Sequence, residues 1–484
     1  MKSVQNGSKR LDPNGWMRNR FPAVFTSSGD ECFQLRKGGT AAFLSAFKAA
    51  ECLGPIGSPN APVRYSPESS TYFAYSPHRG IYQAVGKAEV EHLVYELLEE
   101  CAKEVKSKYV GNVRSVQKPA EVRSVAGALR GLSSFPDPNR HRDLRYVHVE
   151  NGVLDLDTLD LLPFTPDLPS AWKLPVPWTP QPPMPHQFWG MMERLFPDPD
   201  DRALAVEVLS TAFLGNPFQR FVLISGAAGT GKSTLVSLLS KLLGPGASGT
   251  LELAQARRRF TSFSWMGRLL LYEPELTQES LDQGLPALKA ISGHDPMTAE
   301  KKFHSTLIPF TPRALPVLAT NERVRFNCSL SQRAVARRLV AFDVPEPSAP
   351  FAQVPHFAEK LIQTEGPGIL RVFLTEAHRL RQQGHIRPLT NDHIARNGRY
   401  LGMSDVLWSW AKSHVVREQG AAICRDEAIR SAARWLAQHK FPAPTSNTGW
   451  SRRLKPILGA LGGTWSKSLG QGGDLKGWRQ VKLV

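Results

Sequence analysis

The residues with the clearest chemistry form a glycine-rich segment, GAAGTGKS, at residues 226–233. Its spacing is that of a phosphate-binding loop, in which glycines let backbone N–H groups turn inward around phosphate oxygens. Lys232 would reach the β- and γ-phosphates, and the Ser233 hydroxyl would bind Mg²⁺. The residues predicted to contact the nucleotide are Gly226, Ala227, Ala228, Gly229, Thr230, Gly231, Lys232, Ser233 and Thr234.

The flanking residues favour this interpretation over a chance match in an ordinary turn. An apolar run at 221–224 precedes the loop, as expected of a central parallel strand. Leucines at helical spacing follow it from residue 235 to residue 243. The strand–loop–helix order therefore predicts a nucleoside triphosphate site, with ATP and Mg²⁺ as ligands.

Two carboxylates follow a second apolar run at 269–272. Glu273 is placed at the end of the predicted strand, where a carboxylate holds the Mg²⁺ shell and polarises the attacking water. Glu275 is a second candidate, and the alternative is a solvated acidic loop. The sequence predicts Ser233 and Glu273 as the metal ligands, with Glu273 preferred over Glu275 as the catalytic carboxylate.

A polar residue and two arginines flank the remaining predicted strands. Asn321 ends the run LPVLATN, where an amide would orient water against the γ-phosphate. Arg337 and Arg338 lead into LVAFDV, and an arginine finger supplied to a neighbouring site is worth roughly 10³ to 10⁵ in rate. The alternative is a basic strand edge. Arg338 is preferred because it lies closest to the strand, and a finger acting in trans requires a ring.

The elements that position these residues belong to a chain of 484 residues, long enough for several domains. Its formal net charge of +17 favours a polyanionic partner, with nucleic acid ahead of an anionic membrane. No apolar run is long enough to span a bilayer. The five cysteines form no CxxC pair, which argues against a disulfide framework or a zinc finger and favours a reducing cytosol.

Before the nucleotide site, the sequence predicts a small α+β module. Apolar residues at helical spacing predict an amphipathic helix, with Val90, Leu93, Val94, Leu97, Leu98 and Cys101 on one face. The run YVHVENGVLDL predicts a β-hairpin with a type I′ turn at Asn151-Gly152. Nine prolines in the 23 residues 163–185 then indicate a linker or a wrapped extended segment.

The last part of the chain is strongly basic. Residues 391–484 contain 15 Lys or Arg and 6 Asp or Glu. Helices predicted near 404–416, 426–439 and 450–460, followed by a glycine-rich hairpin, give a winged-helix-like order in which Arg452, Arg453 and Lys455 would contact duplex DNA. The alternative is a solvated basic face without a ligand. Trp408, Trp410 and Trp435 are predicted as core residues rather than base-stacking platforms.

The block 226–344 resembles the superfamily 3 helicases, in particular the phage and plasmid primase–helicase branch related to the poxvirus primase–helicase. Four landmarks match in order, namely GAAGTGKS, LLLYEPE, LKAISGHDPMTAEKKF and LPVLATN, and RRL before the last strand is a fifth. The third is the most diagnostic, because Lys289, Gly293 and Asp295 match the pattern of this branch. Two features depart from the family, since Pro274 separates the two carboxylates and too few residues precede the recognisable module for a primase domain.

This resemblance implies an α/β P-loop (AAA+-like) ATPase core with a parallel sheet, preceded by the α+β module and followed by the winged-helix-like domain. It implies a homohexamer that draws single-stranded DNA through a pore, gripped by Lys301 and Lys302 on a hairpin, in the cytoplasm of a bacterial host. A separate primase or polymerase would be a further partner. The predicted segments are 1–60 of unknown role, 61–162, 163–185, 186–345 for the ATPase, 346–390 as linker and helix, and 391–484.

The predicted function is therefore an ATP-dependent DNA helicase that replicates a mobile element. Two other functions remain open at this point: a DNA-binding ATPase that acts as a loader or switch without unwinding, and an origin-binding protein that uses nucleotide only to assemble. A small-molecule kinase is disfavoured, because it leaves the basic surplus, Asn321 and the paired arginines unexplained.

Overall fold

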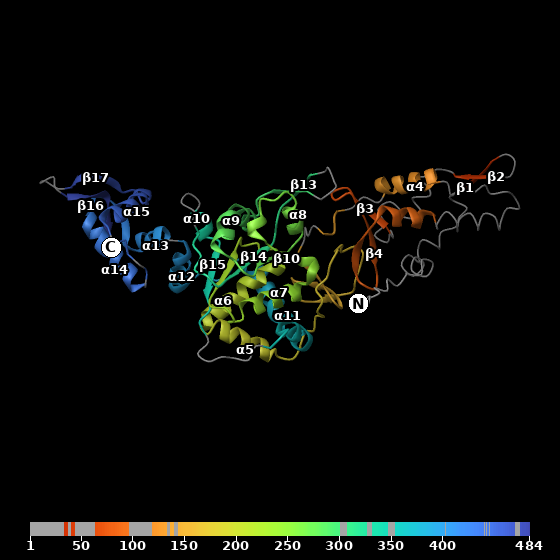
Figure 1. The fold of residues 1–484 in the computed structure, drawn as a ribbon, viewed down its shortest axis with the longest axis horizontal. Coiled ribbons are helices and arrows are strands. Elements are labelled where there is room, and N and C mark those ends of the chain that lie inside the picture. The colour runs from red at the N-terminus through yellow and green to blue at the C-terminus, as the bar shows by residue number, and fades with distance from the viewer. Residues whose placement is uncertain are drawn as a thin grey trace, which may run out of the picture. The chain divides into compact units, whose positions relative to one another are not determined.

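The computed structural model divides into two compact units, residues 1–178 and 179–484 (Figure 1). The structure describes residues 33–36, 40–43, 63–95, 119–132, 136–139, 144–300, 307–326, 332–346, 354–401, 403–439, 441, 443–444, 446–469 and 475–484.

The first unit is built from small antiparallel sheets. β1 (Phe33–Arg36) pairs with β2 (Thr40–Phe43), and β3 (Val63–Ser66), β4 (Thr71–Ser76) and β5 (Ile81–Val85) form a three-stranded meander. Helical residues 87–95 bury Val90, Leu93 and Val94, which confirms that part of the predicted amphipathic helix. Leu97, Leu98 and Cys101 lie outside the described residues. The helix α4 (Pro119–Leu132) contacts β3.

The predicted hairpin is present, but its turn lies one residue earlier than expected. β6 (Tyr146–Val149) and β7 (Gly152–Asp155) pair Val149 with Gly152, so the two connecting residues are Glu150 and Asn151. Neither has a positive φ, and the type I′ prediction was therefore wrong. Asn151 is used differently: its side chain accepts from the N–H of Trp178 and donates to the Trp178 carbonyl, at 2.9 and 3.0 Å. Gly152 is needed because a Cβ there would lie 2.6 Å from the carbonyl oxygen of Leu162 in β8 (Leu161–Leu162).

The proline-rich segment wraps the first unit over much of its length. Its alternate apolar residues are buried up to the unit boundary, namely Trp172, Leu174, Val176 and Trp178. The N–H of Leu174 donates to the carbonyl of His148 at 2.8 Å, and the N–H of Tyr82 donates to the carbonyl of Ser170 at 2.7 Å. These bonds support a wrapped, extended segment at residues 163–178 rather than a free linker.

The second unit contains a five-stranded parallel sheet. In chain order its strands are β9 (Phe221–Ser225), β10 (Ser248–Thr250), β11 (Leu270–Glu273), β14 (Leu315–Thr320) and β15 (Leu339–Asp343). In space the order is β10-β11-β14-β9-β15. β9 therefore lies between β14 and β15, both parallel to it. The prediction of an α/β core with a parallel sheet is confirmed.

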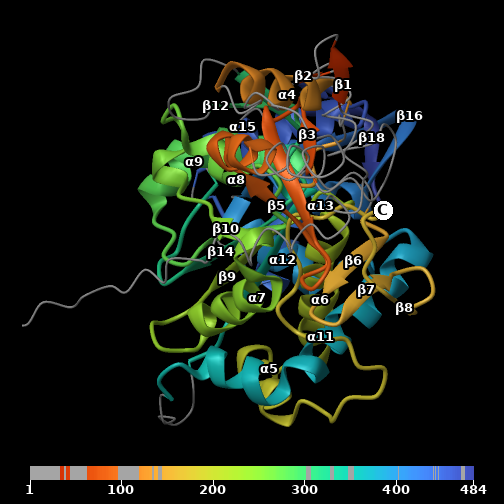
Figure 2. The same ribbon diagram turned by 90° about the vertical axis from the view of Figure 1, so that its right-hand side faces the viewer.

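Helices cover both faces of this sheet (Figure 2). One face packs α9 (Gln278–Gly293) and η4 (Leu253–Gln255) in a core cluster with Leu223, Leu271 and Leu318. The other face carries α7 (Lys232–Ala247), which in turn contacts α11 (Phe357–Gln383). The unit begins with α5 (His186–Leu195), α6 (Pro199–Ser210) and η3 (Thr211–Leu214). The Asp198 side chain caps α6, and Gly215 ends η3 with a φ of 69°.

Four smaller elements complete the part of the unit that contains the parallel sheet. α8 (Thr261–Trp265) contacts β12 (Met297–Glu300), which forms an antiparallel hairpin with β13 (Leu307–Phe310). α10 (Gln332–Ala336) directly precedes the two arginines before β15.

The basic C-terminal part begins with a helix that packs into the sheet core. α12 (Asn391–Leu401) buries Tyr400 and Leu401 in the same cluster as α9. The side chain of Asn397 pairs with the backbone of β15, accepting from Ala341 and donating to Leu339 at 2.9 and 2.8 Å. This helix is thus anchored to the five-stranded parallel sheet, although the sequence groups it with the final basic segment.

Beyond α12, a separate cluster is formed by three helices and a three-stranded sheet. The three predicted helices are present as α13 (Met403–His414), α14 (Arg425–Gln438) and α15 (Asn447–Ala460). The sequence did not predict β16 (Val415–Cys424), which pairs with β18 (Leu475–Leu483), itself paired with β17 (Thr464–Leu469). Trp410 is fully buried, and Trp408 and Trp435 pack against the same core, as predicted. No helix in the described part of the chain is long and apolar enough to cross a membrane.

Candidate functional site

The glycine-rich loop lies at the carboxyl end of the central strand. β9 ends at Ser225, and α7 begins at Lys232, so the loop fills the strand-to-helix connection that its spacing predicts. Gly229 and Gly231 have φ values of 77° and 99°, which glycine adopts without strain. A Cβ on Gly226 would lie 2.7 Å from the carbonyl oxygen of Val344, so only glycine fits beside the end of β15. The residue types of the loop thus follow from its backbone path.

Lys232 is folded back into the loop. Its ammonium donates to the carbonyl oxygens of Gly226 and Ala227 at 2.8 and 2.7 Å, and to the Thr230 hydroxyl at 3.3 Å. Only 3% of the residue is exposed, and this burial lowers the pKa of the ammonium. The acceptors around this desolvated cation are therefore uncharged, and negatively charged phosphate oxygens would be stronger partners for it. Ser233, next in the chain, is exposed.

The loop is hydrogen-bonded to the segments that carry the other predicted residues. The N–H of Gly226 donates to the carbonyl of Thr320, the last residue of β14, at 3.2 Å. The Thr320 hydroxyl in turn donates to the carbonyl of Leu276 at 2.8 Å, and Leu276 lies in the loop after β11. Because β14 lies between β9 and β11, these bonds bring Asn321 and the Glu273 loop to the same edge of the sheet as the glycine-rich loop. Asn321 is exposed there.

Glu273 is the half-buried carboxylate of this edge. Its Oε2 accepts from the backbone N–H of Leu253 at 2.8 Å. Burial raises the pKa of Glu273, the bond from Leu253 opposes this rise, and the charge of Glu252 adds to it. Glu275 is exposed after Pro274. The structure thus separates the two candidates, with Glu273 held in place and Glu275 open to solvent.

Glu252 is a residue that the sequence reasoning did not single out. It follows β10, has a φ of 47°, and accepts from the Thr250 hydroxyl at 3.0 Å. A carboxylate just after a strand was the only available signal, and the short strand β10 was not predicted from the sequence.

The donor set at this edge suits Mg²⁺ held largely by phosphate and water. No three carboxylate, histidine or cysteine side chains converge as a metal site anywhere in the described ranges. Mg²⁺ usually keeps several water ligands and takes one or two protein oxygens beside the substrate phosphates. Ser233 and Glu273 are oxygen ligands of the required kind, so the residues present fit this ion.

The two arginines lie where the parallel strands begin, at the amino edge of the sheet and opposite the glycine-rich loop. The N–H of Phe221, the first residue of β9, donates to the Arg338 carbonyl at 2.9 Å. A five-residue strand spans about 16 Å, which separates this edge from the glycine-rich loop of the same chain. Arg338 is 6% exposed, whereas Arg337 is exposed.

Arg338 is bound to the end of α9. Its Nη1 donates to the carbonyl of Lys289 at 3.0 Å, where a cation satisfies the carbonyl groups and the dipole at a helix C-terminus. A Cβ on Gly293 would lie 2.6 Å from Nη2 of Arg338, so this glycine makes room for the guanidinium. Burial lowers the pKa of Arg338, with the charge of Arg337 adding to the effect. Two residues of the diagnostic sequence pattern, Lys289 and Gly293, thus contact Arg338.

The predicted DNA contacts are described only in part. Lys301 and Lys302 lie outside the described residues, and so does the side chain of Arg452. Lys455 is exposed, and its ammonium lies 4.4 Å from the ring centroid of Trp465 in β17. Arg453 is partly exposed on the same helix, α15.

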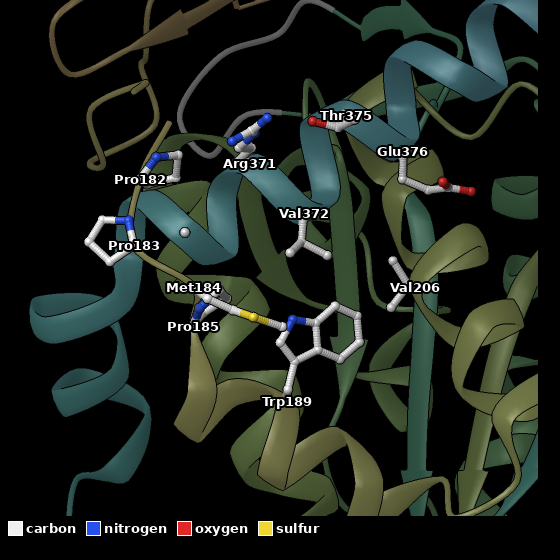
Figure 3. Close-up of a pocket in the computed structure, with 11 residues that line it drawn as sticks. Pro182, Pro183, Met184, Pro185, Trp189, Val206, Arg371, Val372, Thr375 and Glu376 are labelled. Carbon is white, nitrogen blue, oxygen red and sulfur yellow. The ribbon is translucent and has the colours of Figure 1, made fainter. Parts of the chain in front are cut away.

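A separate hollow of about 480 Å³ lies between the start of α5 and the middle of α11 (Figure 3). Trp189 and Met184 face it from one side, and Val372 and Arg371 from the other. Gly368 of α11 lets the Pro183 backbone lie close to the helix, since a Cβ at residue 368 would lie 2.6 Å from the Pro183 carbonyl oxygen. No predicted site residue lines this hollow.

Two protein families match parts of this chain. Residues 56–197 match the family described as D5 N terminal like, and residues 223–338 match a family of unknown function, DUF5906. The first match spans the predicted α+β module and the proline-rich segment. The second begins in β9 and ends at Arg338. No curated protein matches the chain.

The chain is also similar to solved structures of the NrS-1 C-terminal region. The A form apo structure has 10% sequence identity and a TM-score of 0.46, covering 86% of this chain and 95% of that one. Another apo structure of the same region has 12% identity and a TM-score of 0.48, covering 87% and 95%.

Proposed function

We propose that this protein is an ATP-driven DNA helicase of the primase–helicase type, which acts in the replication of a phage or other mobile element. The observation that carries the proposal is the set of bonds from Gly226 to Thr320 and from Thr320 to Leu276. These bonds join the glycine-rich loop, the end of β14 that precedes Asn321, and the loop after β11 that follows Glu273. The residue pattern of each segment predicts a different part of an ATP site: the phosphate loop, the polar sensor and the carboxylate. The match to the D5 N terminal like family supports the order of modules that the resemblance predicts.

In this proposal ATP is bound and hydrolysed at the carboxyl edge of the sheet, where the parallel strands end. Lys232 exchanges the loop carbonyls for β- and γ-phosphate oxygens, while the loop N–H groups surround the phosphates. Ser233 and Glu273 would hold Mg²⁺, whose positive charge would offset the negative charge that develops on the transferred phosphoryl group. Glu273 polarises the attacking water, and Asn321 orients that water against the γ-phosphate.

The amino edge supplies the arginine of a neighbouring subunit. Arg337 is the better candidate for this role, because it is exposed while Arg338 is buried against α9. The length of β9 keeps Arg337 away from the glycine-rich loop of its own chain, so a finger at this position has to serve another copy. A closed ring, with six subunits as in the resembled family, provides such a neighbour at every site.

DNA would contact two regions of the second unit. Lys301 and Lys302 follow β12 in the chain and would grip single-stranded DNA, coupling its movement to the ATPase cycle. The helix α15 and the β17–β18 hairpin, with Arg452, Arg453 and Lys455, would bind duplex DNA in the manner of a winged helix. The strand order β16-β18-β17, with three helices packed against it, supports this proposal.

The test is strand separation on a tailed DNA duplex with ATP, beside the Lys232→Ala protein. Unwinding that the substitution abolishes supports the motor. ATP hydrolysis stimulated by single-stranded DNA without unwinding favours the loader or switch instead. Absence of any turnover leaves an origin-binding protein that uses nucleotide only to assemble.

A further inference from the structure

A tyrosine of α12 lies at the point where the central strand becomes the glycine-rich loop. β9 ends at Ser225, which pairs with Asp343, the last residue of β15. The N–H of Val344 donates to the Ser225 carbonyl at 2.7 Å, and the next residue, Gly226, begins the loop. The Tyr400 hydroxyl donates to Oδ1 of Asp343 beside these strand ends. We name the group formed by Ser225, Asp343 and Tyr400 the loop junction.

The Asp343 carboxylate is held on both of its oxygens by α12. Oδ1 accepts from Tyr400, and Oδ2 accepts from Nη2 of Arg399 at 2.5 Å. Tyr400 is only 6% exposed and belongs to the core cluster that contains α9. Burial, the charge of Asp343 and the bond to it raise the pKa of the Tyr400 hydroxyl, while a hydrogen bond with Ser225 opposes this rise. The hydroxyl therefore stays protonated at neutral pH and remains a donor to Asp343.

The helix α12 is anchored independently of the loop junction. The Arg396 guanidinium donates to both carboxylate oxygens of Asp201 in α6, at 2.7 Å each. His393 bonds to the same carboxylate, with its Nε2 2.8 Å from Oδ1. The backbone carbonyl of Tyr400 accepts from the N–H of Phe326 at 2.9 Å. These bonds make α12 a fixed support, from which the Tyr400 side chain extends to Asp343.

The loop junction in turn limits where the glycine-rich loop can begin. Gly226 lies so close to Val344 that a Cβ on it would be 2.7 Å from the Val344 carbonyl oxygen. The Gly226 carbonyl accepts from the Lys232 ammonium at 2.8 Å. Because Val344 directly follows Asp343, a shift of Asp343 displaces the residue that packs on the start of the loop. The contacts thus lead without interruption from α12 to the cation of the loop.

We propose that Tyr400 is a positioning residue for the glycine-rich loop, through which α12 sets the affinity of the loop for a nucleoside triphosphate. A loop that is held in one conformation binds its ligand more tightly, because only correctly placed molecules are competent to bind. By thermodynamic linkage, nucleotide on the loop also stabilises the contact between α12 and Asp343. The inference rests on the proposed function, since it concerns the regulation of the proposed nucleotide site.

The test measures binding of the fluorescent analogue mant-ATP, with Mg²⁺, to the full chain. Tyr400→Phe removes the hydroxyl and keeps the ring, so the packing stays while Asp343 loses a donor. The dissociation constant should rise roughly 10-fold, near the lower end of what one hydrogen bond to a charged group is worth. KM for ATP should rise with it, whereas kcat at saturating ATP should change by less than about twofold, because bound nucleotide holds the loop by itself.

Two further variants test whether the effect is specific to the loop junction. His393→Ala removes a bond from the same face of α12 to α6, so it should lower the unfolding temperature and leave the dissociation constant unchanged. In an Asp343→Ala background, Tyr400→Phe should have little further effect, because the bond that it removes is already absent. An unchanged dissociation constant in Tyr400→Phe, an equal rise in His393→Ala, or fully additive effects at residues 343 and 400 overturns the proposal.

Hydrogen exchange of the unmodified chain decides the matter if Tyr400→Phe does not fold. Mant-ATP should slow exchange at residues 396–401 of α12 as well as at residues 226–233, because the two segments are linked. Slower exchange that is confined to the loop contradicts the proposal.

The same measurements separate this inference from the proposed function. Absence of mant-ATP binding by the unmodified chain overturns both. Binding that depends on Lys232 and not on Tyr400 leaves the proposed nucleotide site standing and refutes only the role of α12.

Discussion

The carboxyl and amino ends of the strands in the five-stranded sheet, which form its carboxyl and amino edges, carry different groups. At the carboxyl edge, three loops are hydrogen-bonded to one another, and Lys232 is surrounded by carbonyl oxygens that phosphate would replace. At the amino edge, two arginines meet, one buried against a helix end and one exposed. The proposed phosphate site at the carboxyl edge is therefore built within one chain, while Arg337, the proposed arginine finger at the amino edge, is exposed.

Arg337 and Arg338 are adjacent residues of the same type, but they differ in burial. Arg338 donates to the carbonyl of Lys289 and packs on Gly293, so its side chain is fixed at the end of α9. Arg337 is exposed, and it is the arginine that we propose acts on a neighbouring subunit. Substitutions at four positions test whether the carboxyl edge binds ATP and the amino edge provides an arginine to a neighbouring subunit.

The largest effect is expected at the carboxyl edge. Lys232→Ala should leave no measurable ATP turnover, because the loop loses the cation that contacts the β- and γ-phosphates. Steady-state phosphate release measures this. Lys241→Ala is the control, since Lys241 lies on the same helix and pairs with Glu359 at 3.0 Å on the surface. Normal turnover in the Lys232 variant would remove the nucleotide site from this edge.

The next effect tests the amino edge. Arg337→Ala should lower turnover by roughly 10³-fold, the lower end of the range for an arginine finger. Mixing this variant with Lys232→Ala subunits should restore part of the activity, because each mixed pair can build one site from an intact loop and an intact arginine. If rings form and no activity returns, Arg337 does not act on a neighbour.

Arg338 should behave differently from Arg337. Arg338→Ala removes a buried charged hydrogen bond at the end of α9, which should lower the free energy of unfolding by about 2 kcal/mol. Thermal unfolding followed by intrinsic fluorescence compares the two variants. A variant of Arg338 with the unfolding temperature of the unmodified protein and a large decrease in turnover would reverse the two roles.

The smallest effect concerns the pH dependence of turnover. Burial and the charge of Glu252 raise the pKa of Glu273, and Glu273 has to be ionised to polarise water. Turnover should therefore fall, as the pH is lowered, at a higher pH than for an ordinary glutamate. Glu252→Gln removes the nearby charge and lowers the pKa of Glu273, so the acid limb of the profile should move to lower pH by less than about one unit.

An unshifted acid limb in Glu252→Gln would mean that Glu252 does not influence the group that limits turnover. Glu275→Gln is the control for this experiment, since Glu275 is the exposed carboxylate two residues further along the chain from Glu273.

Local chemistry explains why the sequence alone predicted the glycine-rich loop, the parallel core and the three C-terminal helices. The loop requires glycine at fixed positions, as at Gly229 and Gly231 with their positive φ values, and a loop of this kind is flanked by an apolar strand and a leucine-rich helix. These signals lie within a few residues of one another. The order of strands in the sheet, in contrast, depends on pairing between residues far apart, as between Val317 and Val222, and was not predicted.

Contacts between distant segments also explain why the predicted turn was wrong and why β16 was not predicted. The turn at Glu150 and Asn151 depends on a bond from Trp178 to Asn151, and an Asn-Gly pair gives no sign of that partner. β16 is exposed over residues 416–420 and lacks a clear apolar alternation, and it is a strand because β18 pairs with it.

The sequence by itself therefore determined which residues are candidates to bind phosphate, because that chemistry depends on residue type and close spacing. Only the tertiary structure decided which of the two arginines is exposed and which of the two carboxylates accepts a backbone hydrogen bond. Burial and hydrogen bonding are properties of the neighbours that folding brings together, and those neighbours lie tens of residues away in the chain.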